Sequence, residues 1–276
     1  MADTRRVERG RLVDGGNGRG LAAFFCADEA LEPGATISLG EGVARHMRAL
    51  RLSIGSRVTV LDGIGHRAQG RVTKTGTSSA MIEIDEVLAH LPPPSVHLLV
   101  PIADRDRMLW LGEKVAELGA TSWRPVLWRR SRSVKPRGEG MMFQGRLRAR
   151  MVSALEQSAG TWLPQLYPDA SLDRALTALP QGLRVVLDPG AETSIASLTN
   201  ISAPVTIAVG PEGGLEASEI ATLAAAHFQP VRLGGNILRF ETAAIAALAI
   251  VRSLLDAPNT ASPPSDVADL SILQNR

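Results

Sequence analysis

Two glycine-rich segments in the C-terminal third of the chain carry residue types that a small-molecule site needs. Residues 210–214 read Gly-Pro-Glu-Gly-Gly, and residues 234–236 read Gly-Gly-Asn. Glycine lets backbone amides approach a ligand closely and permits positive φ angles, so such loops bind adenosine-type ligands through main-chain groups. Glu212, Arg239 and Glu241 place charges beside the loops. The pair predicts a ligand pocket; for either loop alone, a tight strand-to-helix turn is the alternative.

Several common kinds of site lack their motifs. Neither loop reads Gly-x-Gly-x-x-Gly at the start of a helix with an acidic residue about 20 positions later, so a dinucleotide site is poorly supported. The chain contains neither a P-loop motif nor the Gly-x-Ser-x-Gly of a hydrolase nucleophile elbow. Five scattered histidines and the single Cys26 make no metal cluster, so no metal is expected.

A run of basic residues predicts contacts with RNA phosphates. Between positions 124 and 150 the single acidic residue is Glu139. The basic residues of this run are Arg124, Arg129, Arg130, Arg132, Lys135, Arg137, Arg146, Arg148 and Arg150. Arginine suits phosphate because its planar fork donates paired hydrogen bonds. A GC-rich genome would equally favour arginine over lysine, and a solvated helix face is the other alternative.

The charge of the chain is also divided unevenly. Residues 1–150 hold 24 Lys and Arg against 16 Asp and Glu, whereas the remainder holds 6 against 12. A basic half joined to an acidic half indicates a polyanionic partner that meets one side of the molecule. Arg5, Arg6, Arg9 and Arg11 form a second, weaker basic cluster, offset by Asp3 and Glu8.

The loops must be positioned by strands that alternate with helices. Strands are predicted at residues 96–101, 123–128, 185–187, 205–209 and 230–233. Helices are predicted at residues 107–118, 146–158, 216–227 and from about 242 to 255. This alternation predicts an α/β domain with a mostly parallel sheet and helices on both faces, over residues 96–256. Ligands in such sheets bind beyond the carboxyl ends of the strands, where both glycine-rich loops fall.

The preceding part of the chain has a different pattern. Strands predicted at residues 57–61, 68–74 and 80–87, separated by glycines, indicate a small, mostly antiparallel barrel over residues 1–90. Residues 91–95 read Leu-Pro-Pro-Pro-Ser and are the predicted linker, because proline lacks the amide that helices and sheets need. Residues 257–276 are rich in Ser, Pro, Asp and Asn and are predicted to be a flexible tail.

Composition sets the remaining bounds. A chain of 276 residues with 45% hydrophobic and 21% charged residues can bury a normal core and favours about two domains. One cysteine excludes a disulfide framework and fits a reducing compartment. The N-terminus lacks the apolar core of a signal peptide, and the most apolar helix is too short to span a bilayer, so we expect a cytoplasmic protein without membrane contact.

The residues of both loops resemble the signatures of a known family. Val209–Leu215 with Glu219, and Leu233–Ala243, are similar to the paired motifs of the RsmE group of SPOUT methyltransferases. Further resemblance lies in His46, Leu50-Arg51, Gly55, Asp62-Gly63, Lys114, Glu117-Leu118-Gly119, Arg130-Ser131, Glu156-Gln157-Ser158 and Leu163-Pro164. The chain departs from the family pattern at Asn236 and Phe240, where arginine and threonine are common, near Ala159-Gly160, where an arginine is expected, and at Ile102-Ala103, where a lysine is expected.

The resemblance implies the fold, cofactor, substrate and assembly. Such enzymes transfer a methyl group from S-adenosylmethionine to N3 of a uridine in the 16S rRNA of the small (30S) ribosomal subunit, and the family is named for uracil 1498. They combine a PUA-like barrel with an α/β domain that ends in a deep trefoil knot, and they act as homodimers. The implied cofactor-binding residues are Leu187, Gly210, Pro211, Glu212, Gly213, Gly214, Leu233, Gly234, Asn236, Ile237, Leu238 and Thr242. The RNA-binding candidates are Arg5, Arg6, Arg9, Arg129, Arg130, Arg132 and Lys135.

The reaction itself assigns catalytic candidates. Uridine N3 carries a proton that must leave, helped by a base or by stabilisation of charge on O2 and O4. Arg239 can stabilise that charge, and Glu212 or Glu241 can accept the proton; an ion pair and a helix N-terminal carboxylate are the structural alternatives for the two acids. Another RNA target of a SPOUT enzyme, or a non-catalytic RNA-binding protein of ribosome assembly, remain alternative functions.

The last predicted helix carries the expectation of a dimer. Its residues from Ala243 to Val251 are apolar on nearly every side, so we expect it to be buried on more than one face. Burial wholly within one subunit is the alternative to contact with a second copy. An Ala247→Glu substitution is predicted to split or unfold the dimer.

Overall fold

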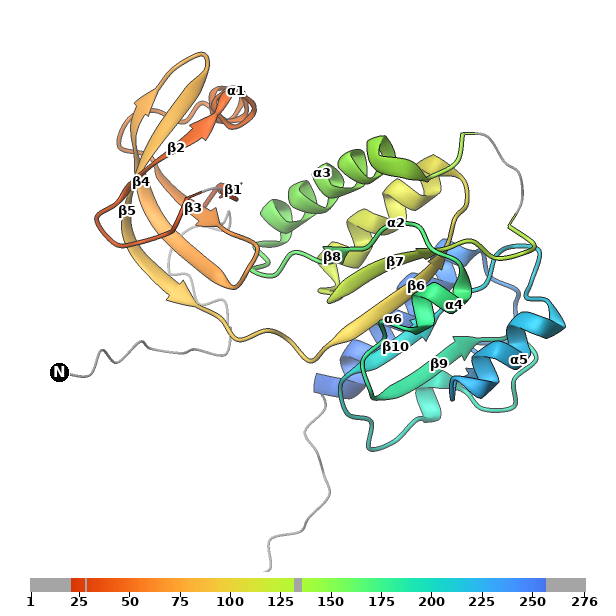
Figure 1. Cartoon of the computed structure of the whole chain (residues 1–276). Helices are drawn as coiled ribbons and strands as arrows, with labels where there is room; N and C mark the ends of the chain where they lie inside the picture. Colours follow the sequence, from red (N-terminus) through yellow and green to blue (C-terminus); the bar gives the residue numbers. More distant parts are fainter. Residues whose placement is uncertain (1–20, 28, 132–135, 257–276) are drawn as a thin grey trace, which may run out of the picture.

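The computed structural model describes residues 21–27, 29–131 and 136–256, and these form two sheets that share no strand (Figure 1). The first sheet contains β1 (Ala23–Phe25), β2 (Thr36–Gly40), β3 (Arg57–Leu61), β4 (His66–Thr75) and β5 (Ser79–Ala89). Its order is β1-β3-β4-β5-β2, and every pairing except β1 with β3 is antiparallel. Helix α1 (Glu41–Ala49) follows β2. The predicted, mostly antiparallel architecture is therefore present, with β1, β2 and α1 added to the three predicted strands.

The second sheet is parallel throughout. It contains β6 (Val96–Pro101), β7 (Ser122–Val126), β8 (Gln165–Leu166), β9 (Leu183–Leu187), β10 (Val205–Ala208) and β11 (Gln229–Val231). The order is β11-β9-β10-β6-β7-β8. All five predicted strands are found within two residues of their expected limits. The two-residue β8 was missed because it is too short to show alternation.

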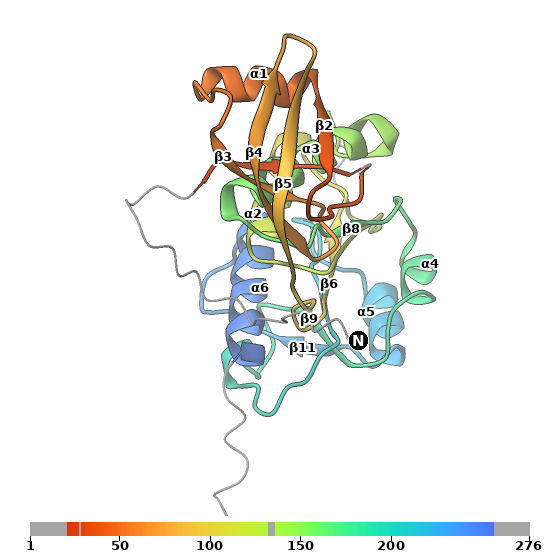
Figure 2. The same cartoon turned by 90° about the vertical axis from the view of Figure 1, so that its left-hand side faces the viewer.

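Helices cover both faces of the parallel sheet (Figures 1 and 2). The helices are α2 (Arg105–Glu117), α3 (Gly140–Ser158), α4 (Leu172–Leu176), α5 (Ala217–Ala225) and α6 (Phe240–Asp256), with a 3₁₀ turn at Ile195–Ser197. One core joins the sheet to α2, α3 and α6, and a second core joins the other face to α4 and α5. The predicted α/β class is confirmed. The trefoil knot stays a prediction.

All four helix starts differ from the predicted residues, by one to six positions, and for α2 and α3 the reason is local. Helix α2 begins two residues earlier than predicted, because Asp104 is its N-cap and accepts hydrogen bonds from the amides of Asp106 and Arg107. Helix α3 begins six residues earlier, at Gly140. Glycine disfavours helix, and Gly138, Gly140 and Gly145 lie in or next to its first turns, so the sequence does not show this start.

Backbone contacts join the two parts of the chain. The amide of Phe25 donates to Glu156 Oε1 at 2.9 Å, and burial raises the pKa of Glu156 above its ordinary value. The amides of Gly65 and Leu163 donate to the carbonyls of Thr161 and Gly63, each at 2.8 Å. Gly65 has a φ of +108°, and a side chain there would collide with the Trp162 ring. The first sheet is thereby held against the end of α3 and the segment after it.

Helix α6 also forms hydrogen bonds with the predicted linker. Arg252 donates hydrogen bonds to the carbonyls of Pro94 and Gly119. The segment between the two sheets therefore contacts the last helix. Within the described residues, no helix is long and apolar enough to cross a membrane. The predicted tail, residues 257–276, lies outside the described residues.

Candidate cofactor site

A cavity of about 620 Å³ lies at the carboxyl ends of β9, β10 and β11. Three loops surround it, at residues 186–189, 209–215 and 233–238, together with one face of α5 and the start of α6. The two glycine-rich loops, which lie 20 residues apart, thus share one cavity. The general rule for ligand position in open parallel sheets places a site at this edge.

The lining of the cavity includes all but one of the expected cofactor-binding residues. Those present are Leu187, Gly210, Pro211, Glu212, Gly213, Gly214, Leu233, Gly234, Asn236, Ile237 and Leu238. Thr242 is the exception, because it is exposed on α6 and does not line the cavity. Sequence reasoning missed Asp188, Pro189, Phe228 and Pro230, which line the cavity without belonging to either motif.

The first glycine-rich loop has its conformation for two separate reasons. Gly214 has a φ of +74°, and its amide closes a turn on the carbonyl of Pro211. Gly213 is instead required by close packing, because a Cβ there would lie 2.9 Å from the carbonyl oxygen of Arg130. In contrast, a Cβ added to Gly234 or Gly235 would meet nothing within 4 Å. Packing against Arg130 is therefore one structural reason for glycine at position 213, which also lines the cavity, as the sequence predicts.

The chemistry of the lining fits an adenosine-type cofactor. Leucine, isoleucine, phenylalanine and proline side chains form most of its surface. Asp188, Glu212 and Asn236 add a few polar groups, and the glycines expose main-chain atoms. Mostly apolar walls with a few polar groups are typical of small-molecule sites. S-adenosylmethionine combines a flat base with hydroxyls and charged groups, so the residues present suit it.

One arginine joins the first glycine-rich loop to the start of α6. Arg107 Nη1 lies 2.6 Å from Glu212 Oε1, and Arg107 Nε lies 3.9 Å from Glu241 Oε1. Glu241 is buried, and its second oxygen has no hydrogen-bond partner among the described residues. The ion-pair alternative is thus present for Glu212. Sequence reasoning missed Arg107, whose one local signal is its position three residues after the Asp104 cap.

Glu219 connects helix α5, which lines the cavity, to the run of basic residues that begins at Arg124. Its carboxylate accepts hydrogen bonds from the amides of Glu216 and Arg129, both at 2.8 Å. The first bond belongs to a capping box at the start of α5, and the second holds the chain after Trp128. Glu219 is therefore a positioning residue that places Arg129 and Arg130 beside the Gly213 loop.

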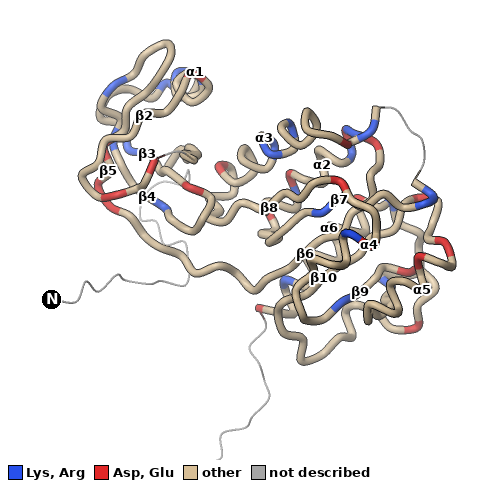
Figure 3. The backbone as a smooth tube through the Cα atoms, in the orientation of Figure 1, with Lys and Arg blue, Asp and Glu red and all other residues tan. Residues whose placement is uncertain are grey.

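The structure divides the predicted basic run. Arg129 and Arg130 have side chains that are 69% and 55% exposed, each within 4 Å of Glu216. Arg146, Arg148 and Arg150 are exposed along α3, and Figure 3 shows basic positions there and on both sides of residues 132–135. Arg124 is buried, so its expected contact with RNA phosphates is wrong for the chain as folded. Arg5, Arg6, Arg9, Arg132 and Lys135 lie outside the described residues.

Comparison with known proteins agrees with this architecture. Residues 90–252 match the model of the RNA methyltransferase domain family, and residues 39–85 match the RNA methyltransferase PUA domain. The ribosomal RNA small subunit methyltransferase E of Synechocystis is 32% identical, over 80% of this chain and 74% of that protein. The protein of the same name from Mycobacterium bovis is 26% identical, over 91% of this chain and 99% of that protein.

A solved structure extends the likeness to three dimensions. The ribosomal RNA small subunit methyltransferase E of Neisseria gonorrhoeae, bound to S-adenosyl methionine, superposes with a TM-score of 0.78 and is 29% identical. The match covers 86% of this chain and 98% of that one. A family model that spans more than half of the chain, relatives similar over most of their length and a shared fold lead to one conclusion. The chain belongs to the ribosomal RNA small subunit methyltransferase E family of RNA methyltransferases.

Proposed function

We propose that this protein transfers a methyl group from S-adenosylmethionine to N3 of a uridine in 16S rRNA, the position of uracil 1498 for which the family is named. The observation that carries the proposal is the single cavity formed by the two glycine-rich loops at the carboxyl ends of β10 and β11. A relative of this family binds S-adenosyl methionine in its solved structure.

The residues around the cavity divide the work of the reaction. The bound cofactor supplies an electrophilic methyl group, and the lining loops fix its orientation, which for a displacement is a large part of catalysis. Arg239 follows the second loop and is exposed, so it can meet O2 or O4 of the uracil and stabilise the charge that develops there. Glu212 lines the cavity, and Arg107 orients its carboxylate as proton acceptor.

Methylation of defined RNA tests the proposal. Purified protein is incubated with S-adenosylmethionine and small ribosomal subunits from a strain that lacks the gene, and the modified nucleoside is located by mass mapping. We expect 3-methyluridine at a single position of 16S rRNA. Methylation of another base or of a ribose would favour a different SPOUT target, and cofactor binding without turnover on any RNA would favour an assembly protein.

Arg129 and Arg130, which are exposed beside the cavity, are proposed RNA-binding residues. Arg132, Lys135, Arg5, Arg6 and Arg9 are proposed as further RNA-binding residues. Arg129→Glu/Arg130→Glu is expected to weaken RNA binding and flatten its salt dependence, because fewer counterions are released when fewer phosphates are neutralised. Cofactor affinity should stay unchanged. Filter binding at several salt concentrations measures the RNA affinity and its salt dependence.

Arg174 provides the control for that double variant, since it is exposed on α4, outside the basic segment. Arg174→Glu should leave the salt slope as in the wild type. Equal losses in both variants would show a response to net charge alone, and an unchanged slope in the double variant would remove these two arginines from the RNA site.

We propose that α6 forms the interface of a homodimer. One side of the helix is buried in its own subunit, through Phe240, Ala244, Ala247, Leu248 and Val251. The opposite side presents the small residues Thr242, Ala246, Ala249 and Ser253, exposed or half-exposed. Among the described residues, Figure 2 shows no other helix or strand beyond α6 at that edge of the domain. Small side chains permit close approach of a second helix, and a twofold dimer would place two copies of the same face together.

The structure changes the choice of the residue whose substitution would test this interface. Ala247 is fully buried within one subunit, so Ala247→Glu would unfold the protein rather than separate two copies. Ala249→Glu instead changes the outward side. We expect a wild-type mass of about 59 kDa by light scattering, twice the 29.3 kDa of the chain, and a folded monomer for Ala249→Glu. A fully active wild-type monomer at micromolar concentration would contradict the dimer.

The remaining proposals concern organisation and location. We propose a PUA-like domain over residues 1–90, a linker over 91–95, a methyltransferase domain over 96–256 and a tail over 257–276. The small (30S) ribosomal subunit is the proposed partner, and because bacterial subunits are assembled in the cytoplasm, the protein is proposed to act there.

A further inference from the structure

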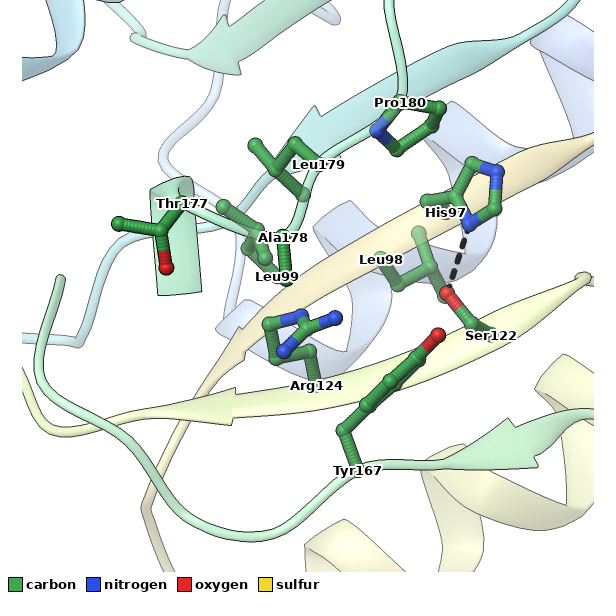
Figure 4. A pocket seen from close by; sticks show the side chains of 10 residues that line it. All are labelled: His97, Leu98, Leu99, Ser122, Arg124, Tyr167, Thr177, Ala178, Leu179 and Pro180. Atoms are coloured by element: carbon green, nitrogen blue, oxygen red, sulfur yellow. Dashed lines mark hydrogen bonds between the residues drawn. The ribbon is translucent and has the colours of Figure 1, made fainter. Parts of the chain in front are cut away.

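A second cavity, of about 440 Å³, lies over β6 and β7 on the face of the sheet that carries α4 (Figure 4). Its floor is formed by strand residues, and its walls are Tyr167 and the segment after α4. The lining residues are His97, Leu98, Leu99, Ser122, Arg124, Tyr167, Thr177, Ala178, Leu179 and Pro180. None of these lines the cofactor cavity, so the two cavities are separate sites.

Arg124 is a buried cation that points into this cavity without an anionic partner. The residue is 7% exposed, and its guanidinium carbon lies 3.7 Å from the centre of the Tyr167 ring. Figure 4 shows the two side chains next to each other at the cavity. Within the described part of the chain, no carboxylate forms an ion pair with it. Burial lowers the pKa of Arg124, but an arginine stays protonated in proteins.

The energy of such an arrangement favours an anion. A buried charge is costly unless it is paired, and stacking on one aromatic ring offsets only part of that cost. The guanidinium carries five N–H donors in a planar fork, a geometry that matches two oxygens of a carboxylate or phosphate. The cavity therefore contains a cation whose N–H donors are able to bind an anion.

The neighbouring groups are polar but not acidic. His97 Nδ1 lies 2.8 Å from Ser122 Oγ. Burial, and then the charges of Arg124 and Arg252, lower the pKa of His97, which favours the neutral ring. The hydroxyl of Tyr167 donates to Gln165 Oε1. No Asp or Glu lines the cavity, so an entering anion would meet one cation and neutral dipoles.

Apart from Thr177, whose hydroxyl donates to the carbonyl of Arg174, the rest of the lining is apolar. Leu99, Leu179 and Pro180 form a surface beside the arginine. The volume lies within the range of small-molecule sites and exceeds what a bare inorganic ion fills. A ligand with an anionic head and a short apolar body would match both halves of the lining.

We propose that this cavity is a second ligand site, which binds a small organic anion with its carboxylate or phosphate group on Arg124 and its apolar part against Leu99, Leu179 and Pro180. The site is distinct from the cofactor cavity and does not depend on the proposed methyl transfer.

His97 reports directly on occupancy of the site. Inorganic phosphate and acetate are titrated separately into the full-length protein at constant ionic strength, balanced with chloride, and the imidazole resonances are followed by NMR across pH. A bound anion offsets the charge of Arg124, so the pKa of His97 should rise, while the resonances of His46 and His227 should not respond. Tighter binding of one probe identifies the head group as phosphate or carboxylate.

Two variants make the test specific. Arg124→Met keeps an unbranched side chain on Tyr167 but removes the charge, and should weaken binding of the better probe about ten- to a hundredfold. Ala178→Trp fills the cavity from an exposed position, so the fold should survive, and should also abolish the response. Arg174→Met is the control at an exposed arginine and should bind as the wild type does. Unchanged affinity for S-adenosylmethionine shows that each variant is folded.

Three results would overturn the proposal. The first is an unchanged His97 titration with both probes at millimolar concentration. The second is a response that persists in folded Arg124→Met. The third is a response that persists in Ala178→Trp, which would show that the anion acts from outside the cavity.

Discussion

Gly234→Val is expected to lower the affinity for S-adenosylmethionine by about 100-fold, which corresponds to about 3 kcal/mol, while thermal unfolding stays as in the wild type. Gly234 lines the cofactor cavity, and a Cβ there would meet no protein atom within 4 Å. Its φ is outside the left-handed region, so valine brings no backbone strain. The added carbons would therefore occupy space that a ligand needs, without disturbing the protein. Isothermal titration calorimetry measures the change.

The adjacent glycine supplies a matched control and a correction. Gly235 has the same open surroundings but does not line the cavity, so Gly235→Val should bind the cofactor almost normally. The sequence predicts that residues 234–236 all belong to the ligand loop, and this is corrected for Gly235, which does not line the cavity. Gly213→Val is unsuitable as a test, because it would displace Arg130. Loss of affinity in Gly235→Val with normal affinity in Gly234→Val would place the ligand elsewhere.

Arg239→Ala is expected to lower the rate of methyl transfer by about 100- to 1000-fold, the loss typical when one donor to a developing negative charge is removed. The side chain is exposed and does not line the cofactor cavity, so stability and cofactor affinity should hardly change. Single-turnover transfer to small ribosomal subunits, at saturating cofactor, isolates the chemical step from cofactor binding.

Arg232→Ala is the control for this variant, since it removes the same charge shortly before the same loop. Its backbone amide bonds to the carbonyl of Thr193, and this bond survives the substitution. We expect near-normal transfer. If Arg239→Ala transferred methyl groups at the wild-type rate, the charge on the uracil oxygens would have to be stabilised by another group.

The sequence determined the elements and the edge of the sheet at which the site lies. Strand β6 and strand β3 begin and end at the predicted residues, because alternation, glycine and proline act over a few neighbours. The two glycine-rich loops could be assigned to one cavity because parallel strands end at the same edge. The motifs of these loops were sufficient to indicate the family.

Only the tertiary structure decided which side chains meet. Arg107 and Glu212 are 105 positions apart, and Arg129 and Glu219 are 90 apart, so no local pattern joins them. Arg124 belongs to a basic run in the sequence but is buried over Tyr167, whereas Arg129 and Arg130, a few residues later, are exposed. Ala247 and Ala249 are alike in sequence, yet one lies in the core and the other on the outward side of α6. The physical reason is the same in each case: residue type and spacing set local backbone conformation, but burial and pairing depend on how distant elements pack against one sheet.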